Sequence, residues 1–220
     1  MGPHVETRQD GFSNRVEYVI MDEANRLIKA FFHSISEGRS MLNSEPALIE
    51  ARTSLGETPL HYLAVENQLE AVQALVARGA EVNTVSDVGG TPLSEAASLG
   101  HARMVKYLLS VGAGTSLEGQ TEPALNEAVR SGSLEIARVL IESGADVNAR
   151  NDVGECALHI AAEKNNIEMV RLLVTAGADL NSQRIFDETP LDIAIRLGAS
   201  NAEAELKLFG GTGSANKSVS

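Results

Sequence analysis

The sequence predicts an all-α solenoid, in which short helix pairs stack into one elongated domain. Two landmarks repeat with a period close to 33 residues. The first is a threonine-proline-leucine element, and its leucines are Leu60, Leu93, Leu125, Leu158 and Leu191. The second is a glycine-alanine pair that begins at positions 79, 112, 144 and 177. Because both landmarks keep the same spacing, one structural unit recurs, and each unit must bury its apolar face against its neighbours.

Each unit is expected to contain a short inner helix followed by a longer outer helix. Thr58, Thr91 and Thr189 each precede a proline, so their hydroxyl groups are placed to cap a helix that starts at that proline. Further along the unit, apolar residues such as Leu69 and Val72 recur with helical spacing. The glycine of the second landmark follows, where a left-handed residue ends the helix at little steric cost. Small alanines in the inner helix allow neighbouring units to approach closely.

The motifs Thr58-Pro59-Leu60-His61 and Asp146-Val147-Asn148 resemble those of the ankyrin repeat, and the resemblance covers residues 22–209. It implies antiparallel helix pairs with a β-hairpin-like finger projecting from each junction. We accordingly expect a polar and flexible segment at 1–21, an N-terminal cap at 22–52, repeats at 53–85, 86–117, 118–150 and 151–183, a C-terminal cap at 184–209, and a disordered tail at 210–220.

The third finger departs from the repeat pattern. The chain is one residue short between Ser116 and Leu125, and Pro123 stands where the capping threonine belongs. The finger glycine is replaced by Thr121 here and by Asp187 in the last finger, although threonine tolerates a positive φ poorly. We therefore expect a non-standard conformation in the third finger. Either a functional role or neutral drift explains the departure.

Composition narrows the classes of partner. The formal net charge of -12 opposes binding to nucleic acid or to an anionic membrane surface, and no apolar run is long enough to span a bilayer. The first residues lack the apolar core of a secretory signal, and the one cysteine, Cys156, has no partner for an internal disulfide. We expect a monomer in the cytoplasm that binds another protein and neither nucleic acid nor membrane.

Catalysis is not indicated by any motif. The sequence has no phosphate-binding glycine loop, no paired cysteine motif and no metalloprotease signature. His61 and His159 hold the motif-histidine position, which in ankyrin repeats serves hydrogen bonding between neighbouring loops, and Cys156 holds a capping position that predicts a buried, unreactive thiol. We expect no enzyme activity, no cofactor and no metal site.

The resemblance implies a concave recognition face made of finger tips and inner helices. Five residues before each motif leucine stand Leu55, Val88, Gln120, Val153 and Phe186. Three residues before it stand Glu57, Gly90, Glu122, Glu155 and Glu188. Two residues after it, the candidate contacts are Tyr62, Glu95, Glu127 and Ile160. An apolar row beside an acidic row is suited to a partner with basic and aliphatic groups. Alternatively, Val88 and Val153 pack between fingers and the glutamates are only solvated.

We therefore predict a non-catalytic protein-interaction module that acts as an adaptor, inhibitor or regulator. Two alternatives stay open. One is an architectural segment that self-associates or assembles a larger complex. The other is an accessory factor to a neighbouring enzyme or toxin.

Overall fold

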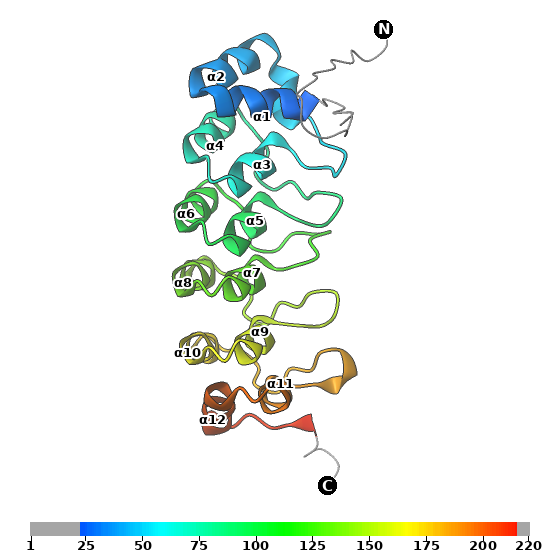
Figure 1. Ribbon diagram of the computed structural model, residues 1–220, viewed down its shortest axis with the longest axis vertical. Helices are drawn as coiled ribbons and strands as arrows, with labels where there is room; N and C mark the ends of the chain where they lie inside the picture. The colour runs from blue at the N-terminus through cyan, green and yellow to red at the C-terminus, as the bar shows by residue number, and fades with distance from the viewer. Residues whose placement is uncertain (1–22, 215–220) are drawn as a thin grey trace, which may run out of the picture.

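The computed structural model describes residues 23–214 and shows the predicted all-α solenoid (Figure 1). Within these residues the α-helices are α1 (Glu23–His33), α2 (Ile35–Ser44), α3 (Pro59–Val65), α4 (Leu69–Val76), α5 (Pro92–Ser98), α6 (Ala102–Ser110), α7 (Ala124–Arg130), α8 (Leu134–Glu142), α9 (Ala157–Glu163), α10 (Ile167–Thr175), α11 (Pro190–Leu197) and α12 (Ser200–Leu208). Two short 3-10 helices are η1 (Pro46–Glu50) and η2 (Ile185–Asp187).

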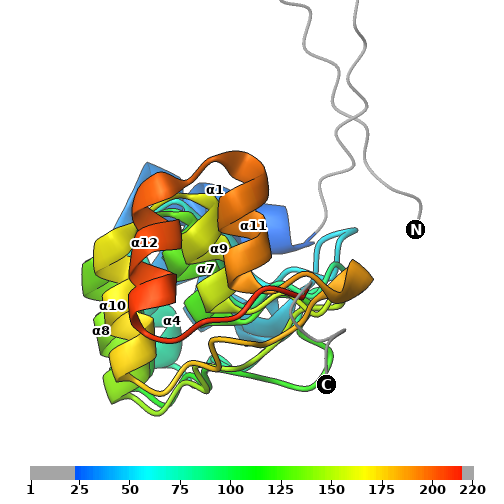
Figure 2. The same cartoon turned by 90° about the horizontal axis from the view of Figure 1, so that it is seen from below.

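The helices form two layers, and the fingers project from one side. The inner helices α3, α5, α7, α9 and α11 lie beside the fingers, and the outer helices α4, α6, α8, α10 and α12 lie behind them (Figures 1 and 2). Each inner helix packs against the inner helix of the next repeat. The surface shared by the fingers and the inner helices is therefore continuous along the molecule.

Inner helices begin where the sequence predicts. The Thr91 hydroxyl accepts a hydrogen bond from the Ser94 amide at 3.0 Å, and the Thr189 hydroxyl accepts one from the Asp192 amide at 3.3 Å. Each side chain thus satisfies an amide of the first helical turn that has no partner within the helix. The proline that follows each threonine stands at the first helical position. An N–H at this position has no acceptor within the helix, so proline, which lacks one, costs the helix no hydrogen bond.

The core runs the length of the stack and is closed at its N-terminal end by α1. Ala64, Ala97 and Ala161 are fully buried, which confirms that small side chains let adjacent inner helices approach closely. Phe31 is buried in the first helix pair, as expected for a residue that closes the core, but 47% of Phe32 is exposed. Only one of these two aromatic side chains therefore closes the core.

Backbone hydrogen bonds connect the first finger with the second, the second with the third, and the fourth with the fifth. The Asp87 amide donates to the Leu55 carbonyl at 2.9 Å, and the Ile185 amide donates to the Val153 carbonyl at 3.1 Å. Side chains reinforce the stack, because Asn148 accepts a hydrogen bond from the Asp179 amide of the next repeat at 2.8 Å. Residues 23–214 contain no assigned β-strand, so the fingers are tight turns. The third and fourth fingers are joined by side chains, because the Asn151 side-chain amide donates to the Glu122 carboxylate at 2.9 Å.

The third finger has the non-standard conformation that its shortened sequence predicts. The positive φ of this finger falls at Gly119, at 82°, and not at Thr121, which takes no left-handed conformation. The Gln120 side chain accepts a hydrogen bond from the Leu117 amide and donates one to the Glu122 carbonyl, so it braces the turn from within. The missing residue is therefore accommodated by relocating the turn.

The predicted disordered tail begins too early, because residues 210–214 continue the repeat. Gly210 has a φ of 91°, close to the 95° of Gly177 one period earlier. The Thr212 amide donates to Asn181 at 2.8 Å, and the Ser214 amide donates to Asp192 at 2.9 Å. These residues occupy the place of a next finger and satisfy polar groups that the last repeat would leave open. The predicted N-terminal segment 1–21 and the tail residues 215–220 lie outside the described residues.

Candidate functional site

The concave face carries a row of exposed apolar side chains at the finger tips. The exposed fractions are 51% for Leu55, 59% for Val88, 44% for Val153 and 91% for Phe186. About half of each valine side chain therefore faces solvent, although the alternative interpretation placed both valines between fingers. The fingers of Leu55 and Val88 are joined by a backbone hydrogen bond, as are those of Val153 and Phe186, so the tips within each pair are presented in a preformed arrangement.

The last finger holds its tip in a strained conformation. Phe186 has φ 68° and ψ 23°, and Asp187 also has a positive φ, of 58°. A left-handed conformation costs a residue with a Cβ about 1–2 kcal/mol. At the same finger position Leu55, Val88 and Val153 take no positive φ. Phe186 is thus both the most exposed large apolar side chain among the described residues and the one on the least favourable backbone.

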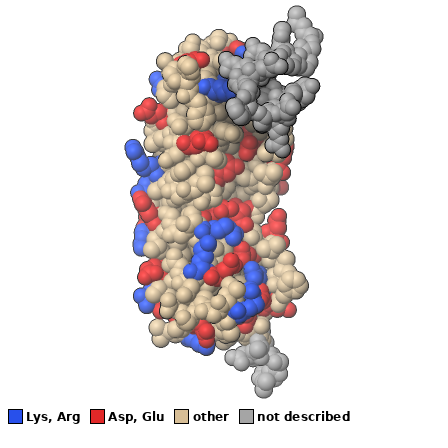
Figure 3. All heavy atoms as spheres, in the orientation of Figure 1, with Lys and Arg blue, Asp and Glu red and all other residues tan. Residues whose placement is uncertain are grey.

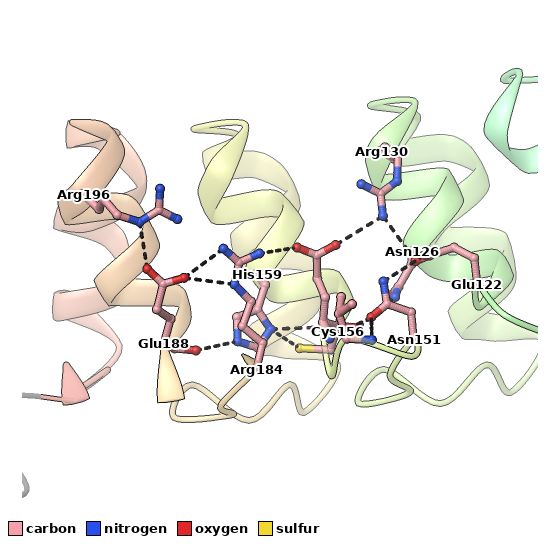
Figure 4. A network of polar contacts seen from close by, with 11 residues as sticks. Glu122, Asn126, Arg130, Asn151, Cys156, His159, Arg184, Glu188 and Arg196 are labelled. Atoms are coloured by element: carbon pink, nitrogen blue, oxygen red, sulfur yellow. Dashed lines mark hydrogen bonds and ion pairs between the residues drawn. The ribbon is translucent and has the colours of Figure 1, made fainter. Parts of the chain in front are cut away.

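Three arginines neutralise the acidic row over repeats three to five (Figure 4). The guanidinium of Arg130, on α7, lies 3.3 Å from Glu122 and 3.3 Å from Glu155. Arg184, at the base of the last finger, lies 2.9 Å from Glu155 and 2.9 Å from Glu188. Carboxylates and guanidinium groups therefore alternate across three repeats. Figure 3 shows these charges interleaved over the lower half of this face, beside α7, α9 and α11.

The ion-pair chain ends on α11, where Arg196 lies 2.8 Å from Glu188. Hydrogen bonds from Arg184 and Arg196 hold the pKa of Glu188 below its ordinary value. Glu155 is only 6% exposed. Glu122, Glu155 and Glu188 do stand in the predicted row, but their carboxylates are already paired with arginines of this chain. Two of the pairing arginines share one position in the repeat, because Arg130 and Arg196 each stand five residues after the motif leucine. An alignment of the repeats at that position would have revealed them.

The first two repeats carry carboxylates without such pairing. Glu57 accepts a hydrogen bond from the Thr53 hydroxyl at 3.3 Å, and neither Glu57 nor Glu95 belongs to any ion pair among the described residues. Burial, with a smaller contribution from the charge of Glu57, raises the pKa of Glu95 to about 7. On the next inner helix, burial raises the pKa of Glu127, and nearby Arg130 only partly opposes the shift. Unpaired acidity is therefore concentrated beside α3 and α5.

The remaining candidates differ in accessibility. Tyr62 is 39% exposed and is available for contact. Ile160 is 1% exposed, so the prediction that it contributes to the recognition face is wrong. Its counterpart on α11, Ile193, is also buried, and α9 and α11 pack against each other. The isoleucines that stand two residues after the motif leucine are thus buried in the core, whereas the tyrosine at this position is exposed. Gln120 serves its own finger, as described above.

The motif histidines have the structural role predicted for them. The Nε2 atoms of His61 and His159 lie 3.3 Å from the carbonyl oxygens of Gly90 and Glu188 in the following fingers. Asn126 holds the same position in the third repeat and donates to the Glu155 carbonyl at 3.1 Å. Burial lowers the pKa of His61 to about 4, so its ring stays neutral at physiological pH. These side chains fix the finger that follows each inner helix.

Cys156 and His159 form a capping pair that is closed to solvent. The Cys156 Sγ atom lies 3.0 Å from the His159 Nδ1 atom, which also accepts a hydrogen bond from the Cys156 amide. Burial raises the pKa of the Cys156 thiol, but the hydrogen bonds and the charge of His159, together with the Leu158 backbone, outweigh this effect and leave the pKa below its ordinary value. Both residues are completely buried, so no substrate reaches the sulfur in this structure. Residues 23–214 also contain no cluster of metal-ligating side chains.

Comparison with known proteins identifies the family to which these repeats belong. A family model described as "Ankyrin repeats (3 copies)" matches residues 19–117, 80–151 and 125–206. The chain therefore belongs to the ankyrin-repeat family. Ankyrin repeats generally mediate protein–protein interaction and typically carry no catalytic site. No helix within residues 23–214 has the length and apolar character needed to cross a bilayer.

Several curated proteins resemble this chain over part of their length. The chain is 34% identical over 107 residues to the nuclear factor NF-kappa-B p105 subunit of Gallus gallus, covering 47% of this chain and 11% of that protein. It is 34% identical over 134 residues to the probable E3 ubiquitin-protein ligase XBOS33 of Oryza sativa subsp. japonica, covering 54% and 25%. It is 35% identical over 78 residues to the 26S proteasome non-ATPase regulatory subunit 10 of Dictyostelium discoideum, covering 35% and 34%. The chain thus spans about a third or less of these relatives.

Proposed function

We propose that this chain is a non-catalytic interaction module that binds a partner protein through its concave face. The observation that carries the proposal is the row of exposed apolar finger tips, Leu55, Val88, Val153 and Phe186, held on hydrogen-bonded fingers. Clustered exposed apolar groups on a rigid scaffold supply the buried anchors that dominate the affinity of protein interfaces. The strained conformation of Phe186 adds support, because backbone strain accumulates at functional positions.

The partner we propose has aliphatic groups for the finger tips and basic groups for the unpaired carboxylates. Because Glu122, Glu155 and Glu188 are paired with arginines of this chain, electrostatic attraction comes mainly from Glu57, joined by Glu95 as it ionises when the pH rises through about 7. We further propose that the protein acts as a cytoplasmic monomer, in the role of an adaptor, inhibitor or regulator. The similarity to a relative named as a regulatory subunit of the 26S proteasome is consistent with such a role.

Affinity capture tests the proposal when it is followed by measurement with purified variants. The unaltered protein and a Phe186→Ala, Val153→Ser double variant are each used to capture proteins from a lysate at low and moderate salt. The affinity of each captured protein for both forms is then measured by calorimetry. The expected result is a partner whose affinity falls at least about tenfold in the double variant, which corresponds to about 1.4 kcal/mol.

The matched control is Leu208→Ser at the end of α12, since Leu208 is 78% exposed but lies on an outer helix. Loss of binding in the control variant, with retention in the double variant, would move the interface away from the concave face. Size exclusion chromatography tests the architectural alternative, because a dimer or larger species at micromolar concentration would support self-association.

A further inference from the structure

A small hollow opens on the concave face between α5, α7 and the fingers that precede them. Its volume is about 170 Å³, and its polar lining includes Ser94, Glu95, Ser98, Glu122 and Glu127. Val88, one of the exposed finger tips, stands at its edge. The hollow therefore joins the apolar row of the proposed interface to a group of carboxylates.

The second repeat lacks two side chains that other repeats have at positions lining this hollow. The residue three positions before the motif leucine is glutamate in the other four repeats but Gly90 here. The fifth residue after that leucine is Arg130 or Arg196 in the third and fifth repeats but Ser98 here. A Cβ atom added to Gly90 would lie only 2.5 Å from the Glu95 Oε1 atom. Glu95 therefore occupies the space that a side chain at position 90 would need.

One carboxylate oxygen in the hollow has no hydrogen-bond partner. The Glu95 Oε2 atom is buried, and it is the only buried side-chain nitrogen or oxygen within residues 23–214 that makes no hydrogen bond. A buried polar group that makes no hydrogen bond destabilises the fold. The other charged residues that line the hollow are Glu122 and Glu127, and Glu57 acts on Glu95 through its charge. Arg130 pairs with Glu122 and Glu155 and is not among the lining residues. The hollow thus holds a carboxylate that lacks a cationic partner.

The C-terminal repeats show which group fits this position. In the third repeat Arg130 stands three residues after Glu127, the spacing that separates Ser98 from Glu95, and its Nε lies 3.9 Å from the Glu127 carboxylate. Its guanidinium also bridges Glu122 and Glu155, as Arg184 bridges Glu155 and Glu188. A planar guanidinium carries several donors in a fixed fork and so contacts two carboxylates at once, which an ammonium group does less well.

We propose that this hollow receives the guanidinium group of an arginine from the partner protein, in the place that the chain's own arginines take in later repeats. The arginine would donate hydrogen bonds to Glu95 and Glu127 while its aliphatic stem lies against Val88. This inference rests on the proposed function and names the side chain that the partner must present. It also explains why the unpaired carboxylates adjoin the exposed finger tips.

The test uses L-argininamide as a probe, with the neutral isostere L-citrullinamide as the matched ligand. Carboxyl carbon resonances of the glutamates are followed by NMR during titration of the full chain at millimolar ligand concentrations. The expected result is a saturable shift at Glu95, and a lower Glu95 pKa, with argininamide only. Absence of a saturable shift, or an equal shift with citrullinamide, overturns the proposal.

Two variants make the result specific. Ser98→Arg places an internal guanidinium where Arg130 stands in the next repeat and should abolish the argininamide response. Ser98→Gln is of similar length but uncharged and should retain most of it. An argininamide response that persists at Glu95 in Ser98→Arg would contradict the assignment of the hollow.

The same variants separate this inference from the proposed function. If a captured partner depends on Phe186 and Val153 but binds Ser98→Arg with unchanged affinity, the arginine site is wrong and the concave interface stands. If argininamide binds at Glu95 while no partner depends on the finger tips, the hollow is confirmed and the proposed interface is wrong.

Discussion

The two halves of the concave face handle the same acidic pattern in opposite ways. From α7 onward, Glu122, Glu155 and Glu188 each lie within 3.3 Å of an arginine of the same chain. Beside α3 and α5, Glu57 and Glu95 take part in no ion pair among the described residues, and Glu95 carries a buried oxygen without a partner. The helical scaffold is the same in both halves. A few side chains facing the fingers therefore decide whether the glutamate carboxylates are paired with arginines of the same chain or are available to a partner.

The largest expected effect comes from breaking the ion-pair chain in the C-terminal half. Arg184→Met keeps the apolar stem of the side chain but leaves Glu155 and Glu188 with one arginine each. Because Glu155 is almost completely buried, removing one partner should lower the free energy of unfolding by about 3 kcal/mol. Urea unfolding monitored by circular dichroism measures the change.

The matched control for Arg184 is Lys106→Met, which removes an exposed ion pair with Glu135 on the outer layer. Exposed pairs contribute little, so the expected loss is about 0.3 kcal/mol. Equal effects in the two variants would show that the concave ion pairs are as weak as surface pairs, and the distinction between the two halves would then lose its energetic basis.

The second prediction concerns pH in the N-terminal half. Burial raises the pKa of Glu95 from 4.5 to about 7, so the folded protein binds this proton more tightly than the unfolded chain does. The resulting stability is fully present below pH 4.5 and is lost as the pH rises through about 7. Glu95→Gln stays neutral and should be more stable than the unaltered protein by on the order of 2 kcal/mol at about pH 8, with little difference at about pH 4.

Urea unfolding at several pH values measures this difference, and Glu118→Gln, a substitution at an exposed position, is the control. A Glu95→Gln variant that loses stability as steeply as the unaltered protein between these pH values would show that Glu95 ionises without penalty in the fold.

The third prediction transfers the pairing of the C-terminal half to the N-terminal half. Ser98→Arg gives Glu95 a guanidinium at the spacing that Glu127 and Arg130 already use. Because the new side chain satisfies a buried oxygen but loses conformational freedom, we expect a gain of about 1 kcal/mol in the free energy of unfolding near neutral pH. Thermal and urea unfolding measure it. If Ser98→Gln is stabilised as much, the gain does not come from the charge.

The smallest expected effect is at the last finger. Phe186→Asn replaces a residue that tolerates a positive φ poorly with one that tolerates it well, and the 91% exposed phenyl ring loses little packing. Stability should rise by about 0.5 kcal/mol while partner binding falls. Val88→Asn is the control, because Val88 is an exposed tip without a positive φ. A gain in both variants would show that relief of backbone strain is not its source.

Much of the fold could be predicted because the relevant chemistry is local and repeats. Thr91 and Thr189 cap the helices that the sequence places after them, and His61 and His159 bond to the following fingers as expected. The sequence also indicated the irregular third finger from a single missing residue. The prediction of a disordered tail from residue 210 failed because the pair Gly210-Gly211 differs from the usual glycine-alanine landmark. The pair nevertheless keeps the 33-residue spacing of the repeat.

The sequence by itself determined the repeat, the helix pairs and the finger tips, since these follow from short motifs that act within one unit. Only the tertiary structure decided which carboxylates are paired, because Arg184 and Glu155 stand 29 residues apart and meet only when two fingers stack. It likewise decided that Ile160 is buried and that Gly90, Glu95 and Ser98 line one hollow. Contacts between units depend on side chains from both neighbours, so no pattern within one repeat reveals them.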